Sequence, residues 1–296
     1  MSAVGGLGAL DAISPRRRRT DRIARAAVLA LTVVAVAPLV LVVYYLVEKG
    51  LGALSVEFFT TDPTGNFLGN PGGIRSALLG TLEMVLVASA MAIPTGIGVA
   101  VWLVEYGRGS RLASVVRFFV DVLTGVPSIV FGLFIYITLV LSGALGGSFA
   151  AWKGAAALAL LMLPVVIRSA EVVLALVPNG LRESALALGA PRWRMIWKVV
   201  LPTALPGLLT GSLLAVARAM GETAPLIFTA QATLVTSYDL NARMNSLPIQ
   251  IFGDVQNANA EVVQRAWGSA LTLVALILLI TLVARFAAAR RSRLVA

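Results

Sequence analysis

The stretch RESALALGAPRWRMIWKVVLP, residues 182–202, is a polar and basic helix–turn–helix pattern within an otherwise apolar chain. Strong helix formers precede Gly189, which supplies the left-handed residue that commonly closes a helix. Pro191 suits the first turn of the next helix. The second helix then carries an apolar face at helical spacing: Trp193, Ile196, Trp197 and Val200. The pattern predicts two short helices meeting at Gly189, a compact projection that another surface could grip.

The composition is that of a membrane protein. Of 296 residues, 58% are apolar and only 13% are charged, whereas soluble proteins carry about 25% charged residues. The chain has no cysteine and no histidine. Thiol chemistry, disulfides, imidazole metal ligands and histidine-activated nucleophiles are therefore excluded, and we expect no catalytic residues and no metal site.

Six apolar runs are long enough to span a bilayer. They cover about residues 26–47, 76–103, 118–141, 154–177, 204–230 and 262–286. Residues 1–25 form a basic N-terminal tail, residues 178–202 the helix–turn–helix, and residues 287–296 a short C-terminal tail. The third run contains the break Thr124-Gly-Val-Pro-Ser128, which is tolerated in a membrane only where protein or water covers the freed backbone groups. The predicted fold is all-α, an integral membrane protein with six transmembrane helices.

The distribution of basic residues predicts the orientation. Most of the 24 Lys and Arg residues lie in both termini, in the short loop after the second run and in the helix–turn–helix. Six spans place these four segments on one side of the membrane. The positive-inside rule makes that side the cytoplasm. The net charge of +10 is thus explained by topology, and no nucleic-acid partner is expected.

Charged residues inside the spans are candidates for function, because they are costly there and usually face a bundle interior or a pathway. Arg168 and Glu171 are spaced to meet on one helix face, as are Arg218 and Glu222. A structural ion pair is the equal alternative for Arg168–Glu171. For Arg218–Glu222 we favour a pathway role, since a guanidinium can donate two parallel hydrogen bonds to an oxyanion. Glu83, like Asp121, is a further candidate nearer a span end.

The helix–turn–helix resembles the coupling loop of ABC importer permeases. The matching positions are Glu183, Ala185, Gly189, Leu201 and Pro202. Ser184 and Val199 depart from that pattern, which has Ala and Ile there. The resemblance implies a six-helix permease bundle whose cytoplasmic helix–turn–helix docks on an ATPase subunit.

A second resemblance covers the chain from about Gly72 to its end. Residues 217–228, which include Gly-Glu-Thr-Ala-Pro at 221–225, are similar to the fifth-span signature of PstA-type permeases of bacterial phosphate importers. Residues 124–133 and 246–252 are similar to other parts of that family. The resemblance implies a phosphate pathway that includes Arg168, Arg218 and Glu222. Glu171 and Glu83 are then pathway or ion-pair residues.

The resemblance also implies the partners. These are a homologous PstC-type permease, a dimer of cytoplasmic ABC ATPase subunits, an extracytoplasmic phosphate-binding protein and the lipid of a bacterial cytoplasmic membrane. The chain has no phosphate-binding loop of the Gly-x-x-x-x-Gly-Lys-Ser/Thr type. ATP and Mg²⁺ are therefore expected in the partner, and this chain is expected to be a transport subunit without a cofactor or enzymatic activity.

Three alternatives remain open. The first is a permease for another oxyanion, such as sulfate or molybdate, because the phosphate reading depends on the 221–225 signature. The second is a carrier or channel that works without ATP, for which the helix–turn–helix has no obvious purpose. The third is an intramembrane enzyme, which the absence of histidine and of an acidic dyad disfavours.

Overall fold

A computed structural model describes residues 15–65, 70–143 and 146–293. Within these ranges the chain is helical and has no strand; an isolated bridge joins Pro63 and Gly72. The chain divides into two units, Met1–Glu48 and Lys49–Ala296. Helix α1 (Pro15–Gly50) contains all the described residues of the first unit, ends two residues beyond it, and runs without interruption through Pro38. This helix begins eleven residues before the expected span, so part of the expected basic tail is helical; residues 1–14 lie outside the described ranges.

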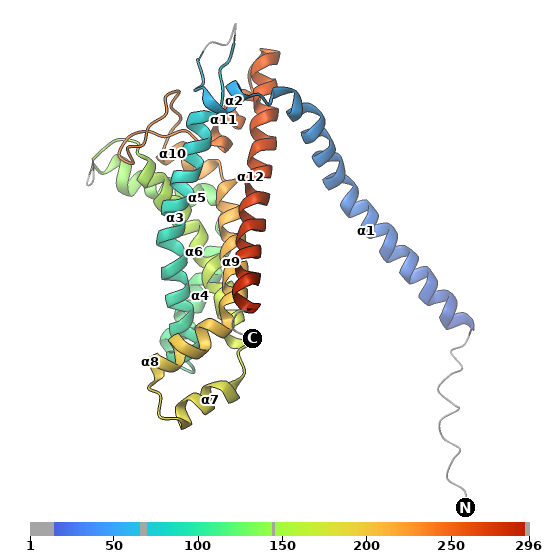
Figure 1. Cartoon of the computed structure of the whole chain (residues 1–296), viewed down its shortest axis with the longest axis vertical. Coiled ribbons are helices and arrows are strands. Elements are labelled where there is room, and N and C mark those ends of the chain that lie inside the picture. The colour runs from blue at the N-terminus through green and yellow to red at the C-terminus, as the bar shows by residue number, and fades with distance from the viewer. Residues whose placement is uncertain (1–14, 66–69, 144–145, 294–296) are drawn as a thin grey trace, which may run out of the picture. The chain divides into compact units, whose positions relative to one another are not determined.

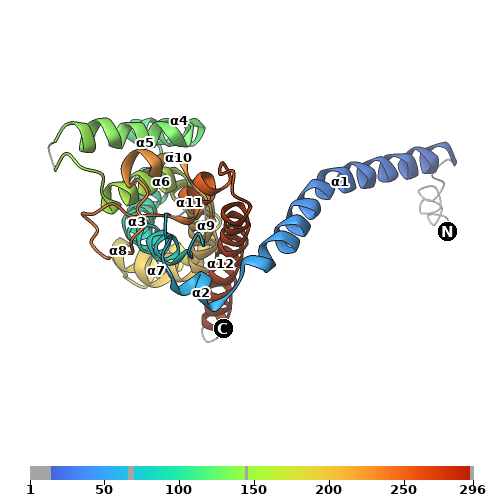
Figure 2. The same cartoon turned by 90° about the horizontal axis from the view of Figure 1, so that it is seen from above.

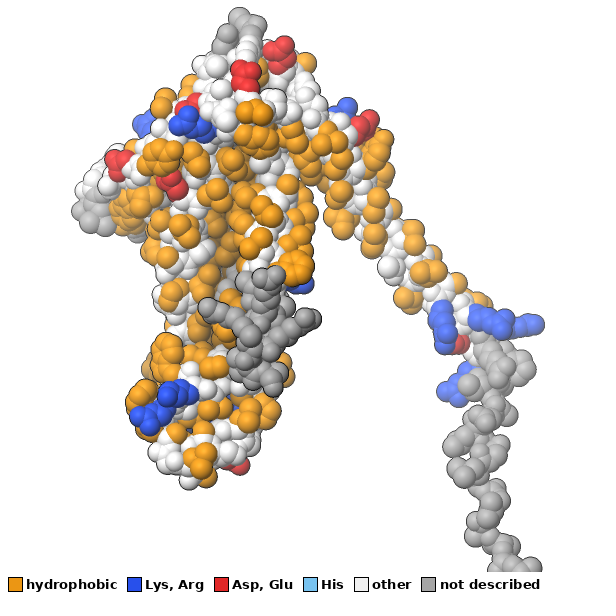
Figure 3. All heavy atoms as spheres, viewed as in Figure 1, with side chains coloured by type: hydrophobic (Ala, Val, Ile, Leu, Met, Phe, Trp, Pro, Cys, Tyr) orange, Lys and Arg blue, Asp and Glu red, His pale blue; other side chains and the backbone are white. Residues whose placement is uncertain are grey.

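Four long helices form the second unit. They are α3 (Arg75–Val101), α6 (Ala151–Ala175), α9 (Leu201–Met220) and α12 (Ala260–Arg293). Figures 1 and 2 show them side by side, with α6 in contact with α3 and α9, and α9 in contact with α12. Along the middle of this bundle the surface is mainly apolar, and charged side chains gather toward its two ends (Figure 3). That distribution suits a bundle embedded in a bilayer.

Small residues allow these helices to pack closely, as is common between membrane helices. Gly207 and Gly211 form a Gly-x-x-x-Gly pair on α9 that faces α6. A Cβ at Gly207 would lie 2.5 Å from Val173, and one at Gly211 would lie 2.3 Å from Ser169. The core between α3, α6 and α9 is likewise built from Ala and Met side chains, including Ala88, Ala155, Met162 and Ala215.

The third predicted span is not a single straight helix. It consists of α4 (Arg111–Gly125) followed by α5 (Ser128–Ile135) and the π-helix η3 (Tyr136–Leu141), and the two parts are bent by 104°. The bend falls at Val126 and Pro127, which have extended backbone conformations. Pro127 has no amide hydrogen to continue the helical ladder, which explains why the helix stops here.

The fifth predicted span, 204–230, is also interrupted. Helix α9 ends at Met220, and the short helix α10 (Ala224–Thr229) begins after a gap of three residues. Pro225 lies in the first turn of α10, where its missing amide hydrogen is tolerated. This helix packs on α5 so closely that a Cβ at Gly132 would lie 2.6 Å from the Cα of Pro225.

The helix–turn–helix forms one end of the bundle, below in Figure 1. Its helices are α7 (Asn179–Ala187) and α8 (Arg192–Met195), the second continued by the π-helix η4 (Ile196–Val200) into α9. Gly189 has φ 77°, the left-handed conformation that the sequence predicts. The predicted single apolar face is wrong, however: Ile196 and Val200 are buried, whereas Trp193 and Trp197 are exposed. Ile196 to Val200 form a π-helix, which has more residues per turn than the α-helix that the spacing assumes.

The opposite end carries shorter elements. These are the 3₁₀ turn η1 (Leu51–Ala53), α2 (Val56–Thr60) and α11 (Leu247–Asp254). Lys153 is buried there and donates from Nζ to the carbonyls of Leu139 at 2.9 Å and Ser148 at 2.8 Å. It thereby fixes the start of α6 to the preceding loop.

Five helices of the described chain are long and apolar enough to cross a membrane, and the bent pair makes six if it counts as one crossing. The predicted number of spans is reached only with that pair. Helix α3 continues through the π-helix η2 (Trp102–Tyr106), and α12 continues past the expected end of its span at residue 286 to Arg293. Most of the expected C-terminal tail is therefore helical, and residues 294–296 lie outside the described ranges.

Candidate functional site

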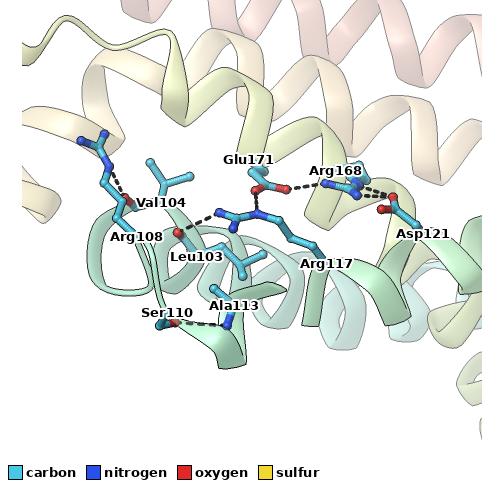
Figure 4. A network of polar contacts seen from close by, with 9 residues as sticks. All are labelled: Leu103, Val104, Arg108, Ser110, Ala113, Arg117, Asp121, Arg168 and Glu171. Atoms are coloured by element: carbon cyan, nitrogen blue, oxygen red, sulfur yellow. Dashed lines mark hydrogen bonds and ion pairs between the residues drawn. The ribbon is translucent and has the colours of Figure 1, made fainter. Parts of the chain in front are cut away.

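A row of four charged residues joins α4 to α6 (Figure 4). Arg117 donates from Nε to Glu171 at 2.6 Å, and Arg168 donates from Nη1 to the other oxygen of Glu171 at 2.8 Å. Arg168 also donates from Nε to Asp121 Oδ1 at 2.8 Å. Positive and negative charges alternate along the row and cancel, so the four side chains balance one another's charges without a further ion.

The predicted Arg168–Glu171 contact is thus present as one member of a larger network. Arg168 uses Nε, Nη1 and Nη2 on two carboxylates. Arg117, which the sequence places in the short basic loop after the second apolar run, donates to Glu171 and to the carbonyl of Leu103, the latter at 3.2 Å. Its partner lies 54 residues away, so no local spacing could have revealed this contact.

The network makes a prediction about stability. Glu171 bonds both arginines and its side chain is 14% exposed, whereas Asp121 bonds one arginine and is largely exposed. Glu171→Gln should therefore lower the free energy of unfolding by about 2 kcal/mol, as expected for hydrogen bonds to charged groups. Asp121→Asn should cost less than about 1 kcal/mol, since exposed ion pairs contribute little. Thermal unfolding of the purified permease in one detergent measures both, and equal losses would contradict this ranking.

Arg218 and Glu222 are arranged differently. Arg218 Nε lies 3.6 Å from Glu222 Oε1, within ion-pair range but beyond an ordinary hydrogen bond. The Arg218 side chain is 49% exposed and that of Glu222 is 16% exposed. Among the residues that the structure describes, none accepts a hydrogen bond from the Arg218 guanidinium. Its donors are therefore available to an incoming anion, unlike those of Arg168.

An apolar groove of about 660 Å³ lies between α3 and α9. It extends from Trp197 and Pro202 at the helix–turn–helix to Val216, and Arg218 is not among the residues that line it. Pro94 and Gly98 of α3 form part of the opposite wall. Its lining is almost entirely apolar, with Ser212 as a polar exception, so the groove suits apolar contacts and not an anion.

Glu83 lies half-buried on α3. Within the described part of the chain it has no ion-pair partner, so the structure provides no pair for this candidate. The described residues contain no group of three or more Asp or Glu side chains able to hold a metal ion.

The five residues that match the coupling-loop pattern divide into two groups. Glu183, Gly189 and Pro202 are exposed on the helix–turn–helix. Ala185 and Leu201 pack against an apolar cluster that includes buried residues of α6, η4 and α9. The pattern therefore places some residues at a surface and uses others to hold that surface on the bundle.

Sequence reasoning missed two buried ion pairs. Arg182 meets Glu105 at 2.9 Å, and Arg265 meets Asp254 at 2.7 Å, each with both side chains at most 8% exposed. Arg182 belongs to the basic stretch 182–202, and Arg265 lies near the start of the sixth apolar run. Glu105 lies 77 residues from its partner, which is why spacing along the chain gave no sign of it.

Comparison with known proteins defines the class of this bundle. Residues 92–295 match the family described as binding-protein-dependent transport system inner membrane component. A solved structure described as inward facing conformations of the MetNI methionine ABC transporter has a similar fold, with a TM-score of 0.57 at 23% identity. The match covers 74% of this chain and 94% of that one. The bundle is therefore that of a multi-pass ABC permease, a transport component.

Relatives along nearly the whole chain narrow the class further. The phosphate transport system permease protein PstA of Yersinia pestis is 41% identical over 93% of this chain and 92% of that protein. Permease protein PstA 1 of Mycobacterium tuberculosis strain H37Rv is also 41% identical, over 94% of this chain and 92% of its own length. The chain belongs to the family of PstA-type phosphate transport permeases.

Proposed function

We propose that this chain is the transmembrane permease subunit of an ATP-driven importer of inorganic phosphate. The observation that carries the proposal is Arg218, a half-exposed guanidinium on a membrane helix with no hydrogen-bond acceptor among the described residues. Such a charge is costly against lipid. It becomes favourable where a second surface and a water-filled path cover it, and where a phosphate oxyanion accepts its paired N–H groups.

The exposure of Arg218 supports a pathway shared with a second, homologous permease of the PstC type. Glu222 beside it holds the guanidinium when no phosphate is bound and competes with the arriving anion, so phosphate is bound without being trapped. Arg168 already bonds Asp121 and Glu171. We assign it to shaping the pathway, with phosphate contacting Arg218 first.

The remaining partners follow from the two ends of the bundle. A dimer of ABC ATPase subunits, which holds ATP and Mg²⁺, docks on the exposed residues of the helix–turn–helix, Glu183 and Gly189 among them. Exposed residues of the loops 50–73 and 231–261 at the opposite end receive an extracytoplasmic phosphate-binding protein; Asp254 lies in the second loop but is buried and is not among them. The distribution of basic residues supports a cytoplasmic location for the helix–turn–helix and both termini, with the bundle in the cytoplasmic membrane of a bacterium.

The mechanism is alternating access. ATP-driven closure of the ATPase dimer moves the helix–turn–helix, and the two permeases rock to expose Arg218 to one side and then the other. The chain itself performs no hydrolysis; its residues bind, orient and release the anion.

Uptake of labelled phosphate into proteoliposomes tests the proposal. The vesicles contain this chain, its candidate sister permease, the ATPase and the binding protein, with sulfate and molybdate as competitors. ATP-dependent phosphate uptake that neither competitor reduces supports the proposal. ATP-dependent uptake of sulfate or molybdate instead would show that the substrate assignment is wrong and that the proposed coupling to ATP is right. Uptake without ATP in a verified complex would make the chain a carrier and overturn the proposed coupling.

A further inference from the structure

A buried ion pair connects the helix–turn–helix to the end of α3. Arg182, in α7, donates from Nε to Glu105 Oε1 at 3.0 Å, and its Nη2 lies 2.9 Å from the same oxygen. The side chains are 7% and 6% exposed. Glu105 belongs to η2, the π-helix that ends α3. A widened turn of this kind is frequent at functional positions.

The same guanidinium also holds the end of α6. Arg182 Nη2 donates to the carbonyl of Leu174 at 2.8 Å, and Nη1 donates to that of Val177. These carbonyls belong to the last turn of α6 and the residues just after it, where a positive charge is favourable. One side chain therefore joins three elements: α7, the end of α6 and the end of α3.

Apolar side chains surround this junction, but their contacts alone do not fix the relative positions of α7, α6 and α3. The cluster around it includes Ala100 and Val104 near the end of α3, Leu174 of α6 and Val200 of η4. Apolar contacts are non-directional. An ion pair removed from water, by contrast, must keep its geometry or leave a charge uncompensated. The pair therefore resists relative movement of these elements more strongly than the apolar contacts do.

The adjacent side chains of Arg182 and Glu183 on α7 point to opposite sides, one into the bundle and one toward its surface. Glu183 is exposed on α7, whereas Arg182 beside it is buried and bonded inward. Glu183 is thus available to a partner, whereas Arg182, the residue before it, is bonded to the bundle.

We infer that Glu105 and Arg182 are positioning residues that make α7, the end of α6 and the end of α3 move as one body. The inference rests on the proposed docking of an ATPase on the helix–turn–helix. Movement applied to α7 then reaches α3 and α6 through this pair instead of being absorbed between residues 176 and 178. Loss of the pair uncouples ATP hydrolysis from transport without removing either the docking surface or Arg218.

A matched control exists at the opposite end of the bundle. Arg265 donates to Asp254 at 2.7 and 2.8 Å, and both side chains are buried to the same degree as Glu105 and Arg182. This second pair contacts neither α7 nor the end of α6. Glu105→Gln and Asp254→Asn therefore remove the same kind of interaction, but only the first change affects the proposed connection.

The first experiment measures phosphate transported per ATP hydrolysed by the complete complex in proteoliposomes. Glu105→Gln should lower this ratio by about fivefold or more, the lower range of coupling between distant sites. Asp254→Asn should leave the ratio at the wild-type value even where it lowers stability. A wild-type ratio in Glu105→Gln, or an equal fall in both variants, would overturn the inference.

A second readout does not depend on the transported anion. The chain has no cysteine, so Leu86→Cys on α3 and Leu278→Cys on α12 introduce its only two sites for spin labels. Both positions are exposed. In the complex with a cysteine-free ATPase, ATP should change the distance between the labels in the wild-type background and in Asp254→Asn, but much less in Glu105→Gln. If the wild-type complex transports no phosphate, the proposed substrate fails, and the label distances still decide whether the pair transmits movement.

A double variant that removes both Glu105 and Arg182 distinguishes loss of coupling from misfolding caused by an unpaired buried charge. Glu105→Gln alone leaves Arg182 without its carboxylate, whereas Glu105→Gln combined with Arg182→Gln leaves no uncompensated charge. The double variant should assemble and show the same loss of coupling. A double variant that assembles with a wild-type ratio and a wild-type distance change would show that apolar packing alone transmits the movement.

Discussion

Arg218→Gln is expected to leave the permease inserted and assembled while reducing phosphate uptake by about 100-fold. Glutamine removes the charge and the paired N–H donors that a phosphate oxyanion accepts. Losing about 3 kcal/mol of charge-assisted hydrogen bonding corresponds to about two factors of ten. Uptake by the complete complex in proteoliposomes, compared at equal amounts of assembled complex, measures the effect.

Assembly should survive this change because the fold depends little on Arg218. Its contact with Glu222 is 3.6 Å long and half-exposed, and pairs of that kind contribute at most about 1 kcal/mol. Arg218→Lys should give intermediate uptake, since it keeps the charge but loses the planar fork. Arg111→Gln removes an exposed arginine from the start of α4 and serves as the control. Failure of Arg218→Gln to insert or assemble would show that the residue is structural and that its assignment to the pathway is wrong.

Gly189→Val is expected to weaken binding of the ATPase by about tenfold while the spans stay inserted. Gly189 has φ 77°, and a side chain in the left-handed region costs about 1–2 kcal/mol, which is about a factor of ten in affinity. No atom lies within 4 Å of a Cβ built there. The cost is therefore backbone strain, which changes the angle between α7 and α8.

The matched control is Gly180→Val. Gly180 lies on α7 with equally open surroundings, and it is not among the residues with positive φ. It changes helix propensity without forcing the turn open. Co-purification and equilibrium binding of the ATPase to detergent-solubilised permease measure both variants. If Gly180→Val weakened binding as much as Gly189→Val, the turn at Gly189 would not be what positions the docking surface.

The sequence contained enough to predict each feature that depends on near neighbours. The apolar runs predict the long helices, because a membrane helix is defined by length and hydropathy. The spacing of Arg168 and Glu171, and of Arg218 and Glu222, predicts contacts that the structure contains. Gly189 predicts a turn because only the residue type at one position is needed to favour left-handed backbone.

Local pattern was an incomplete guide at two places. The segment at Thr124–Ser128 predicts the break that the structure contains, but the pattern does not give the size of the bend, 104°. The face carrying Trp193 and Ile196 follows from an α-helical period, whereas η4 has a π turn. A π-helix has more residues per turn than an α-helix, and Trp197 in η4 and Trp193 just before it are both exposed.

By itself, the sequence determined the membrane class, the long spans, the turn at Gly189 and the candidate Arg218. Only the tertiary structure decided that Arg168 bonds Asp121 and Glu171 while Arg218 keeps its donors available. It also decided that Glu105 and Arg182 meet across 77 residues. The physical reason is that helical period and hydropathy act between near neighbours. The partner of a buried charge depends on which helices the packing of small residues brings together.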